Sequence, residues 1–247
     1  MIRSEDLQGH WRRNWIRAPG HCDETTRVHW IQSGRWCVDI RVPLHRPGVA
    51  EADCLADMSP ADLAVLLTAE GFAGRITLDG DICTWHRDWN WRGFPCPVDA
   101  GRLWFDDAGH LIEDGVHADY REEWQPVPGA PWQARALVSE AATGLLMHNA
   151  RDFLLALGQP GAPARPELPA ALAEGTAQSA QAAPVFASIY ILGHWDGTDG
   201  IADLSTQPFC EGWPVLQSNS AGTDLILPDV HGRTIRLPLE THPLPAP

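Results

Sequence analysis

Residues 75–91 read RITLDGDICTWHRDWNW, and this stretch decides how the chain is expected to fold. Apolar and polar residues alternate on either side of Asp79-Gly80, and such alternation is typical of β-strands with one buried face. An Asp-Gly pair between two alternating runs is a strong signal for a β-hairpin, because both residues tolerate the positive φ angles of a tight turn. The stretch therefore predicts two antiparallel strands, at 75–78 and 81–91.

The same pattern extends in both directions from this hairpin. Turn residues at 33–34, 107–109 and 114–115 separate further short runs of alternating residues. Consecutive hairpins form an antiparallel meander, and closure into a barrel removes the unpaired edges of such a sheet. The sequence thus predicts an all-β fold built on an antiparallel up-and-down β-barrel. Its predicted strands are 9–18, 25–33, 35–43, 75–78, 81–91, 101–105, 110–113 and 117–125.

One segment, near 59–71, interrupts the alternation and predicts a short helix. Ser59 is a good N-cap, Pro60 suits the first helical position, and Gly71 is a typical stop. A helix at this point would cover one end of the barrel.

The chain is expected to divide into three parts. Residues 1–158 would form the barrel, residues 159–183 an Ala- and Pro-rich linker with a weak helix, and residues 184–247 a further β segment. The linker offers few apolar residues to bury, so we expect little packed structure in it. The last part has the alternation of strands, which leaves open whether they complete the first barrel or pack on it as a separate unit.

The composition narrows the range of functions. The 247 residues include 32 Asp and Glu and 18 Lys and Arg, which gives a net charge of −14. Every one of the 18 basic residues is arginine. The absence of lysine excludes Schiff-base and phosphate-loop chemistry, and the acidic surplus argues against nucleic acid as a partner.

The compartment is expected to be the cytoplasm. The first residues have no apolar stretch typical of a secretion signal, and no later run approaches the roughly 18 apolar residues of a membrane span. The six cysteines form no C-x-x-C pair, so the sequence predicts reduced thiols and neither a metal site nor a cofactor.

Charged residues interrupt two aromatic strand faces. Arg87 alternates with Trp85 and Trp89, and Glu122 lies between Tyr120 and Trp124. Each charge is either half of a structural ion pair or a group that faces a ligand inside the barrel. Tryptophan is unusually frequent, with 12 residues, and we expect nine of them to line one cavity. These are Trp11, Trp15, Trp30, Trp36, Trp85, Trp89, Trp91, Trp104 and Trp124.

The leading hypothesis is therefore a protein that binds a small apolar or aromatic ligand in a tryptophan-lined cavity. The residues expected to bind the ligand are Arg41, Trp85, Arg87, Trp89, Tyr120, Glu122 and Trp124. A second hypothesis is an isomerase, hydratase or decarboxylase in which His86 with Asp88, or Tyr120 with Glu122, forms an acid–base pair. A third is a protein-interaction module around a filled barrel.

Four motifs within residues 9–126 form a recognisable pattern. They are Val38-Asp39-Ile40-Arg41, Trp85-His86-Arg87-Asp88, Asp99-Ala100-Gly101, and Glu113-Asp114-Gly115 followed by Tyr120-Arg121-Glu122-Glu123-Trp124. The pattern resembles that of the Hri1-like family of fungal and bacterial proteins. The resemblance implies a lipocalin-like, calycin-type β-barrel, and it carries over no established catalytic residues.

Overall fold

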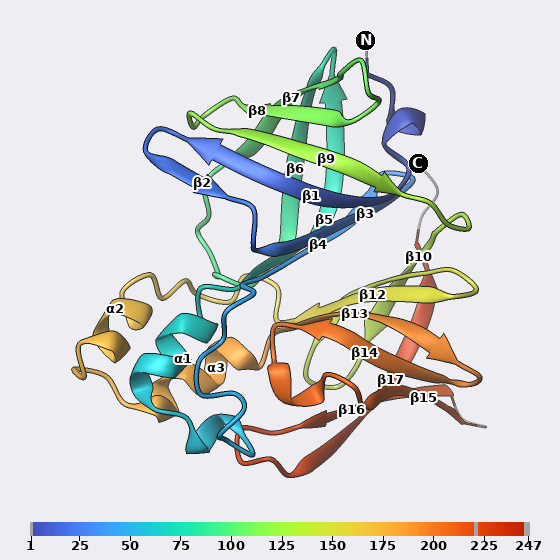
Figure 1. Ribbon diagram of the computed structural model, residues 1–247. Helices are drawn as coiled ribbons and strands as arrows, with labels where there is room; N and C mark the ends of the chain where they lie inside the picture. Colours follow the sequence, from blue (N-terminus) through green and yellow to red (C-terminus); the bar gives the residue numbers. More distant parts are fainter. Residues whose placement is uncertain (1, 220–221, 245–247) are drawn as a thin grey trace.

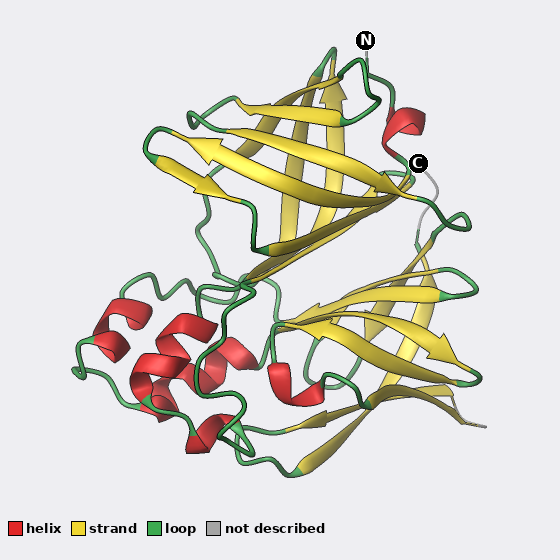
Figure 2. Ribbon diagram, viewed as in Figure 1, coloured by secondary structure: helices red, strands yellow, loops and turns green. Residues whose placement is uncertain are grey.

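The computed structural model describes residues 2–219 and 222–244, which form two antiparallel β-barrels with short helices beside them (Figures 1 and 2). In Figure 1 the N-terminal barrel lies above the C-terminal barrel, and the helices lie at the lower left. The all-β barrel fold predicted from the sequence is confirmed. None of the helices in the described ranges is long and apolar enough to cross a membrane.

The first barrel contains eight strands in an up-and-down order, with one short extra strand. β1 pairs with both β3 and β9, which closes the barrel, and β2 pairs with the far end of β1. The hairpin predicted around Asp79-Gly80 is confirmed, with Gly80 and Asp81 as its two turn residues, because Asp79 pairs with Ile82 and Leu78 with Cys83. The strands are β1 (Gly9–Ala18), β2 (His21–Asp23), β3 (Arg27–Ser33), β4 (Trp36–Val42), β5 (Glu70–Asp79), β6 (Ile82–Asn90), β7 (Asp99–Phe105), β8 (Leu111–Gly115) and β9 (Arg121–Val127).

The second barrel is formed by the remaining eight strands, and it is closed by the pairing of β10 with β17. Here the strand pairing differs from the expected division, which grouped residues 133–158 with the first barrel. Residues 143–158 form two of these strands, joined by a tight turn in which the side chain of Asn149 accepts hydrogen bonds from the backbone of Arg151 and Asp152. The strands are β10 (Gln133–Val138), β11 (Thr143–His148), β12 (Asp152–Gly158), β13 (Ile189–Asp196), β14 (Asp199–Ser205), β15 (Pro214–Asn219), β16 (Gly222–Pro228) and β17 (Thr234–Pro243).

The helix predicted near 59–71 is present but shorter. Ser59 caps it by accepting a hydrogen bond from the backbone of Asp62 at 3.1 Å, and β5 begins soon after its end. The expected linker is also packed, because Leu168 and Leu172, four residues apart on one helix, are both buried in a cluster that includes Leu63. The helices are α1 (Pro60–Leu66), α2 (Leu168–Ala173) and α3 (Ala183–Phe186), with 3₁₀ turns at Ser4–Leu7, Leu55–Asp57, Ser179–Ala182 and Pro208–Cys210.

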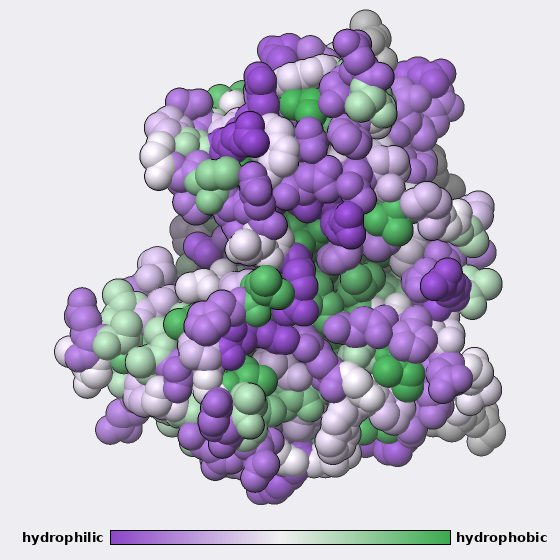
Figure 3. Space-filling view, in the orientation of Figure 1, coloured by the Kyte–Doolittle hydropathy of each residue, from purple (hydrophilic) through white to green (hydrophobic). Residues whose placement is uncertain are grey.

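The outer face of β4 forms part of the contact between the two barrels. Val38 and Ile40 are fully buried in one apolar cluster with Leu154 and Ala156 of β12. Figure 3 shows apolar surface, in green, along the junction between the barrels on this face. Residues 37, 39 and 41 of β4 point the other way, so this strand is buried on both faces.

The interiors of the two barrels differ in chemistry. The second barrel is filled by apolar side chains from all around its wall, including Leu137, Phe153, Ile191, Val215 and Leu225. The first barrel has an apolar end and a charged end.

A pair of half-buried histidines lies on the outward side of the first barrel wall. Nε2 of His10 and Nδ1 of His29 are 2.8 Å apart, and the ring of Trp132 packs edge-on against His10. Burial lowers the pKa of His10 to about 4 and that of His29 to about 3, and the guanidinium of Arg12 contributes to both shifts. The His10 ring and the guanidinium of Arg27 also lower the pKa of His29.

We predict that this pair makes the fold sensitive to acid. Both folded pKa values lie below the ordinary value of 6.5, so the stability that the pair contributes is present above pH 6.5 and is lost as the pH falls towards about 4. Urea unfolding of the wild type and of the His10→Gln, His29→Gln double variant between pH 7.5 and 4.5 measures the effect. The free energy of unfolding should fall less steeply with decreasing pH in the double variant than in the wild type. A variant of the exposed His86, His86→Gln, should have the same pH dependence as the wild type. Equal pH dependence in all three proteins would contradict the prediction.

Candidate functional site in the first barrel

A β-bulge in the β5–β6 pair decides which side chains of β6 face the interior. Arg87 lies opposite Gly74 and Trp89 lies opposite Ala73, so Asp88 is an extra residue between them. A bulge adds one residue to a strand and therefore reverses the alternation of faces beyond it.

This reversal divides the aromatic face predicted for β6. Trp85 faces the interior of the first barrel, as expected. Trp89 faces outward, where its Nε1 donates a hydrogen bond to Thr143 of the second barrel at 3.2 Å. Trp91 packs edge-on against Phe186 of α3, with ring centroids 5.5 Å apart. The two later tryptophans therefore belong to the contact with the second barrel rather than to a ligand cavity.

Four tryptophans, Trp11, Trp30, Trp85 and Trp124, lie together inside the first barrel. The ring of Trp30 packs edge-on against Trp85 and Trp124, at centroid distances of 5.7 and 5.9 Å. Of the nine tryptophans expected to line one cavity, these four therefore face the interior of the first barrel. The others have different surroundings: Trp15 and Trp104 line an outer groove, and Trp36, Trp89 and Trp91 pack towards the second barrel.

A set of ionisable side chains, which we call the charged cluster, lies beside these tryptophans. Its members are Arg13, Asp39, Arg41, Arg87, Asp99, Glu113 and Glu122.

Glu122 lies at the centre of the charged cluster and is 1% exposed. Its Oε1 accepts hydrogen bonds from Arg13 at 2.7 Å and from Arg41 at 3.4 Å. Arg41 also donates to Asp39 at 2.9 Å, and Arg13 to Asp23 at 2.9 Å. Two of these carboxylates are thus bridged by one guanidinium, which meets the general requirement that buried charges be paired.

Arg87 and Asp99 form the rim of the charged cluster. Nη2 of Arg87 lies 2.6 Å from Oδ2 of Asp99, and both side chains are 18% exposed. The guanidinium of Arg87 also lies 4.2 Å above the ring of Phe72, a cation–π contact. This end of the barrel interior is therefore in contact with solvent.

Glu113 is the carboxyl group of the charged cluster that forms no ion pair with an arginine among the described residues. It lies directly opposite Glu122 on the neighbouring strand, and its carboxyl accepts hydrogen bonds from the Tyr120 hydroxyl at 2.7 Å and from Trp124 Nε1 at 3.2 Å. Burial, followed by the charges of Glu122 and Asp99, raises the pKa of Glu113 well above its ordinary value. Two adjacent carboxyl groups with such different partners are a recognised feature of functional sites.

A void of about 10 Å³ lies where the aromatic and charged groups meet. This volume suits about one water molecule, so the side chains of the first barrel fill most of its interior. The space enclosed by the tryptophans predicted to line a cavity is therefore limited to this void. The void is lined by Trp30, Asp39, Arg41, Phe72, Trp85, Asp99, Glu113 and Trp124.

The two acid–base pairs predicted from the sequence have other partners. Nε2 of His86 lies 2.9 Å from the Thr77 hydroxyl, and Asp88 forms an ion pair with Arg75, all on the outer face of the barrel. Tyr120 lies at the charged cluster, but its hydroxyl donates to Glu113 rather than to Glu122.

Of the seven predicted ligand-binding residues, the structure brings six to the charged end of the first barrel and places Trp89 outside it. Sequence reasoning missed Arg13, Asp39, Asp99 and Glu113. Asp39 could have been found, because it lies two residues before Arg41 on the same strand face. Glu113 could not, because only the pairing of β8 with β9 brings it opposite Glu122.

No known family model matches this chain, and no curated protein matches its sequence. Among solved structures, the chain is similar to the crystal structure of an uncharacterised protein, YLR301w, from Saccharomyces cerevisiae. The identity is 12% and the TM-score 0.49, and the match covers 96% of this chain and 86% of that chain. That protein is itself uncharacterised, so the comparison assigns no activity to the charged cluster.

We predict losses of stability of very different size for two conservative substitutions on neighbouring strands. Glu122→Gln removes the charge that holds two arginines and should lower the free energy of unfolding by about 3–5 kcal/mol. Glu113→Gln resembles a protonated carboxyl and should cost at most about 1 kcal/mol at pH 4.5. Urea unfolding followed by tryptophan fluorescence gives both values, and similar losses for the two variants would contradict the assignment.

The pH dependence of the Glu113→Gln variant is a further prediction. The folded pKa of Glu113 is raised above its ordinary value of 4.5, so its contribution to stability is fully present below pH 4.5 and is lost as the pH rises through the raised pKa. Glutamine does not titrate, so the variant should gain stability relative to the wild type as the pH increases from 4.5 to 8. A constant difference across this range would show that the pKa of Glu113 is not raised.

Proposed function

We propose that the first barrel binds a small organic amine, with its ammonium group at the void between Trp30, Trp85 and Glu113. The observation that carries this proposal is the lining of the void, in which three carboxyl groups and four aromatic rings surround the space and one guanidinium borders it. Aromatic faces and carboxylates together are the common protein surroundings of organic cations.

The charge balance supports a cation rather than an anion. Arg41 is already paired with Asp39 and Glu122, and Arg87 with Asp99. Glu113 has two neutral donors and no cationic partner among the ion pairs of the described residues. An ammonium group beside Glu113 would therefore complete the pairing, and it would favour the ionised form of this carboxyl.

The size of the void limits which part of the ligand enters. Space for about one water molecule accepts an ammonium group but not an aromatic ring. The apolar or aromatic body predicted from the sequence would lie at the rim, beside Arg87 and Arg41, whose planar guanidinium groups stack well on rings. These arginines would thus bind the ligand, as the sequence predicts, although they would contact its body rather than its charged group.

Acid–base catalysis on the bound amine is a second candidate function. It is favoured by one observation, that Glu113 and Glu122 are adjacent but have neutral and cationic partners respectively. Under this hypothesis Glu113, hydrogen-bonded to Tyr120, exchanges the proton. Incubation of the protein with the bound amine in D₂O, followed by NMR, separates catalysis from simple binding, because only catalysis exchanges carbon-bound hydrogen or alters the amine.

Membership of the Hri1-like family, a calycin-type relationship for the barrel and a cytoplasmic location are also proposals. The first two rest on the sequence motifs, and they gain support because Asp39, Arg41, Tyr120, Glu122 and Trp124 of those motifs lie in or beside the charged cluster. The location rests on the sequence patterns alone.

Three probes with the same ring and different polar groups test the proposed ligand class. We expect benzylammonium to bind at least about tenfold more tightly than benzyl alcohol, because a hydrogen bond to a charged group contributes about 1.5 kcal/mol or more. Benzoate should bind most weakly. The measurement is calorimetric titration, supported by quenching of tryptophan fluorescence.

Two variants provide the controls for this titration. Glu113→Gln should remove the preference for benzylammonium over benzyl alcohol, whereas Asp88→Asn, on the outer face of the same barrel, should leave it unchanged. Preferential binding of benzoate, or no binding of any probe, would overturn the proposal.

Binding should also release a proton. An ammonium group beside Glu113 lowers the pKa of this carboxyl from its raised value, so benzylammonium should displace up to one proton per site when the pH lies between the lowered and the raised pKa. Titration in two buffers with different ionisation enthalpies gives the number of protons released. That number should fall to about zero in Glu113→Gln, and a value of zero in the wild type would count against the role of Glu113.

A further inference from the structure

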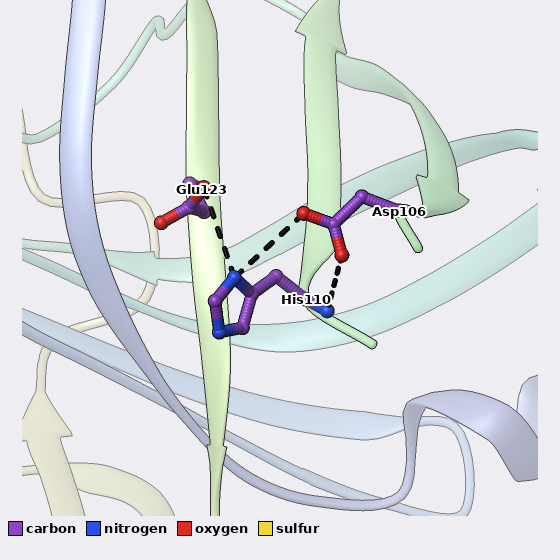
Figure 4. A group of neighbouring side chains, drawn as sticks. All are labelled: Asp106, His110 and Glu123. Carbon is purple, nitrogen blue, oxygen red and sulfur yellow. Dashed lines mark hydrogen bonds and ion pairs between the residues drawn. The ribbon is translucent and has the colours of Figure 1, made fainter. Parts of the chain in front are cut away.

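Three side chains that can bind a metal ion converge on the outer surface of the first barrel, away from the charged cluster (Figure 4). Asp106 and His110 lie at the two ends of the β7–β8 turn and are joined by a backbone hydrogen bond of 3.0 Å. Glu123 lies on β9, opposite Ile112 of β8. One ligand atom from each residue lies within 4.8 Å of the other two.

The carboxylates are held so that one oxygen of each faces the histidine. Oδ1 of Asp106 accepts hydrogen bonds from the backbone of Ala108 and His110, at 2.9 and 2.8 Å. Oε1 of Glu123 accepts a hydrogen bond from the side chain of Asn14 at 3.0 Å. The remaining oxygens, Oδ2 and Oε2, are directed at Nδ1 of His110, as Figure 4 shows. Such outer hydrogen bonds are how proteins orient metal ligands.

The distances fit a shared cation better than a direct hydrogen bond. Nδ1 of His110 lies 3.7 Å from Oδ2 of Asp106 and 3.8 Å from Oε2 of Glu123. Both separations exceed the roughly 2.7–3.2 Å of an N–H···O hydrogen bond, and a single N–H can point at only one of the oxygens. A metal with bonds of about 2.1 Å holds tetrahedral ligands about 3.4 Å apart, so each of the two distances to Nδ1 of His110 is within a few tenths of an ångström of the separation that a shared metal requires.

We propose that Nδ1 of His110, Oδ2 of Asp106 and Oε2 of Glu123 bind a divalent first-row metal ion, with Zn²⁺ as the best match. One imidazole and two carboxylates form a mixed set that zinc accepts readily, and the side chains are 20–35% exposed, so the ion can enter from solvent. The sequence predicted no metal site because these residues follow no motif: the β7–β8 turn and the register of β9 bring them together.

The site adjoins a surface groove that could complete the coordination. Asp106 lines this groove of about 880 Å³ together with Trp15, Trp104, Tyr120 and Arg121. Three protein ligands leave a coordination position for water or for a polar group of a molecule in the groove.

Calorimetric titration of the whole protein with Zn²⁺ tests this site. The wild type should bind one Zn²⁺ ion per chain. His110→Gln and Glu123→Gln should each weaken binding by about 100-fold or more, and Asn14→Ala, which removes an outer hydrogen bond, by about tenfold. All three positions are at least partly exposed, and circular dichroism checks that each variant is folded.

Two matched variants distinguish this site from adventitious binding. His194 contacts a single carboxylate, Asp203, at 2.9 Å on the surface of the second barrel, and Cys22 is an exposed thiol. His194→Gln and Cys22→Ser should both bind Zn²⁺ like the wild type. Loss of binding in either of them, retention of binding in both His110→Gln and Glu123→Gln, or no binding by the wild type would overturn the proposal.

The spectrum of bound Co²⁺ gives a test that needs no variant. Cobalt in a site of nitrogen and oxygen ligands shows d–d bands without thiolate charge transfer, and this spectrum is the expected one. A strong thiolate-to-cobalt band at one equivalent would place the ion on a cysteine and contradict the assignment.

Discussion

The buried charges of the first barrel are the constraint on which the rest of its structure depends. Glu122 is 1% exposed, and a carboxylate at that depth is tolerated only when cations pair with it. Arg13 and Arg41 come from different strands to meet this need. The strand pairing of the barrel wall is irregular beside two of the arginines. The bulge in β1 follows Arg13, and the bulge in the β5–β6 pair lies at Arg87. Bulges are a usual means of redirecting side chains beside a site.

The second barrel contributes mainly apolar packing, whereas the first barrel contains the charged cluster. The second barrel has an apolar interior, and with the helices it covers the outer face of β4 and β5. The contact is close at Gly71, where a Cβ atom would lie 2.6 Å from the ring of Tyr190. Because apolar burial outside the first barrel supports its wall, the inside of that wall can carry charges, whose pairing contributes little net stability.

Much of the site could be predicted from strand alternation. Arg41, Trp85, Arg87, Glu122 and Trp124 are inward-facing, as their positions in the sequence indicated. Prediction failed where alternation itself is interrupted. The bulge at Gly74 turns Trp89 outward, and a Cβ on Gly74 would lie 1.9 Å from the carbonyl oxygen of His86, so the bulge depends on glycine at that position. A single glycine in a strand is too weak a signal to locate a bulge.

The sequence by itself determined the local elements: the Asp79-Gly80 hairpin, the capped helix at Ser59, and the succession of strands that must close into barrels to avoid free edges. These follow from turn chemistry and from alternation within about ten residues. Tertiary structure alone decided that the strands form two barrels, that Glu113 faces Glu122, and that Asp106, His110 and Glu123 meet at one point. The reason is physical, because these contacts join residues whose proximity depends on strand register and closure, and register is a property of the assembled sheet.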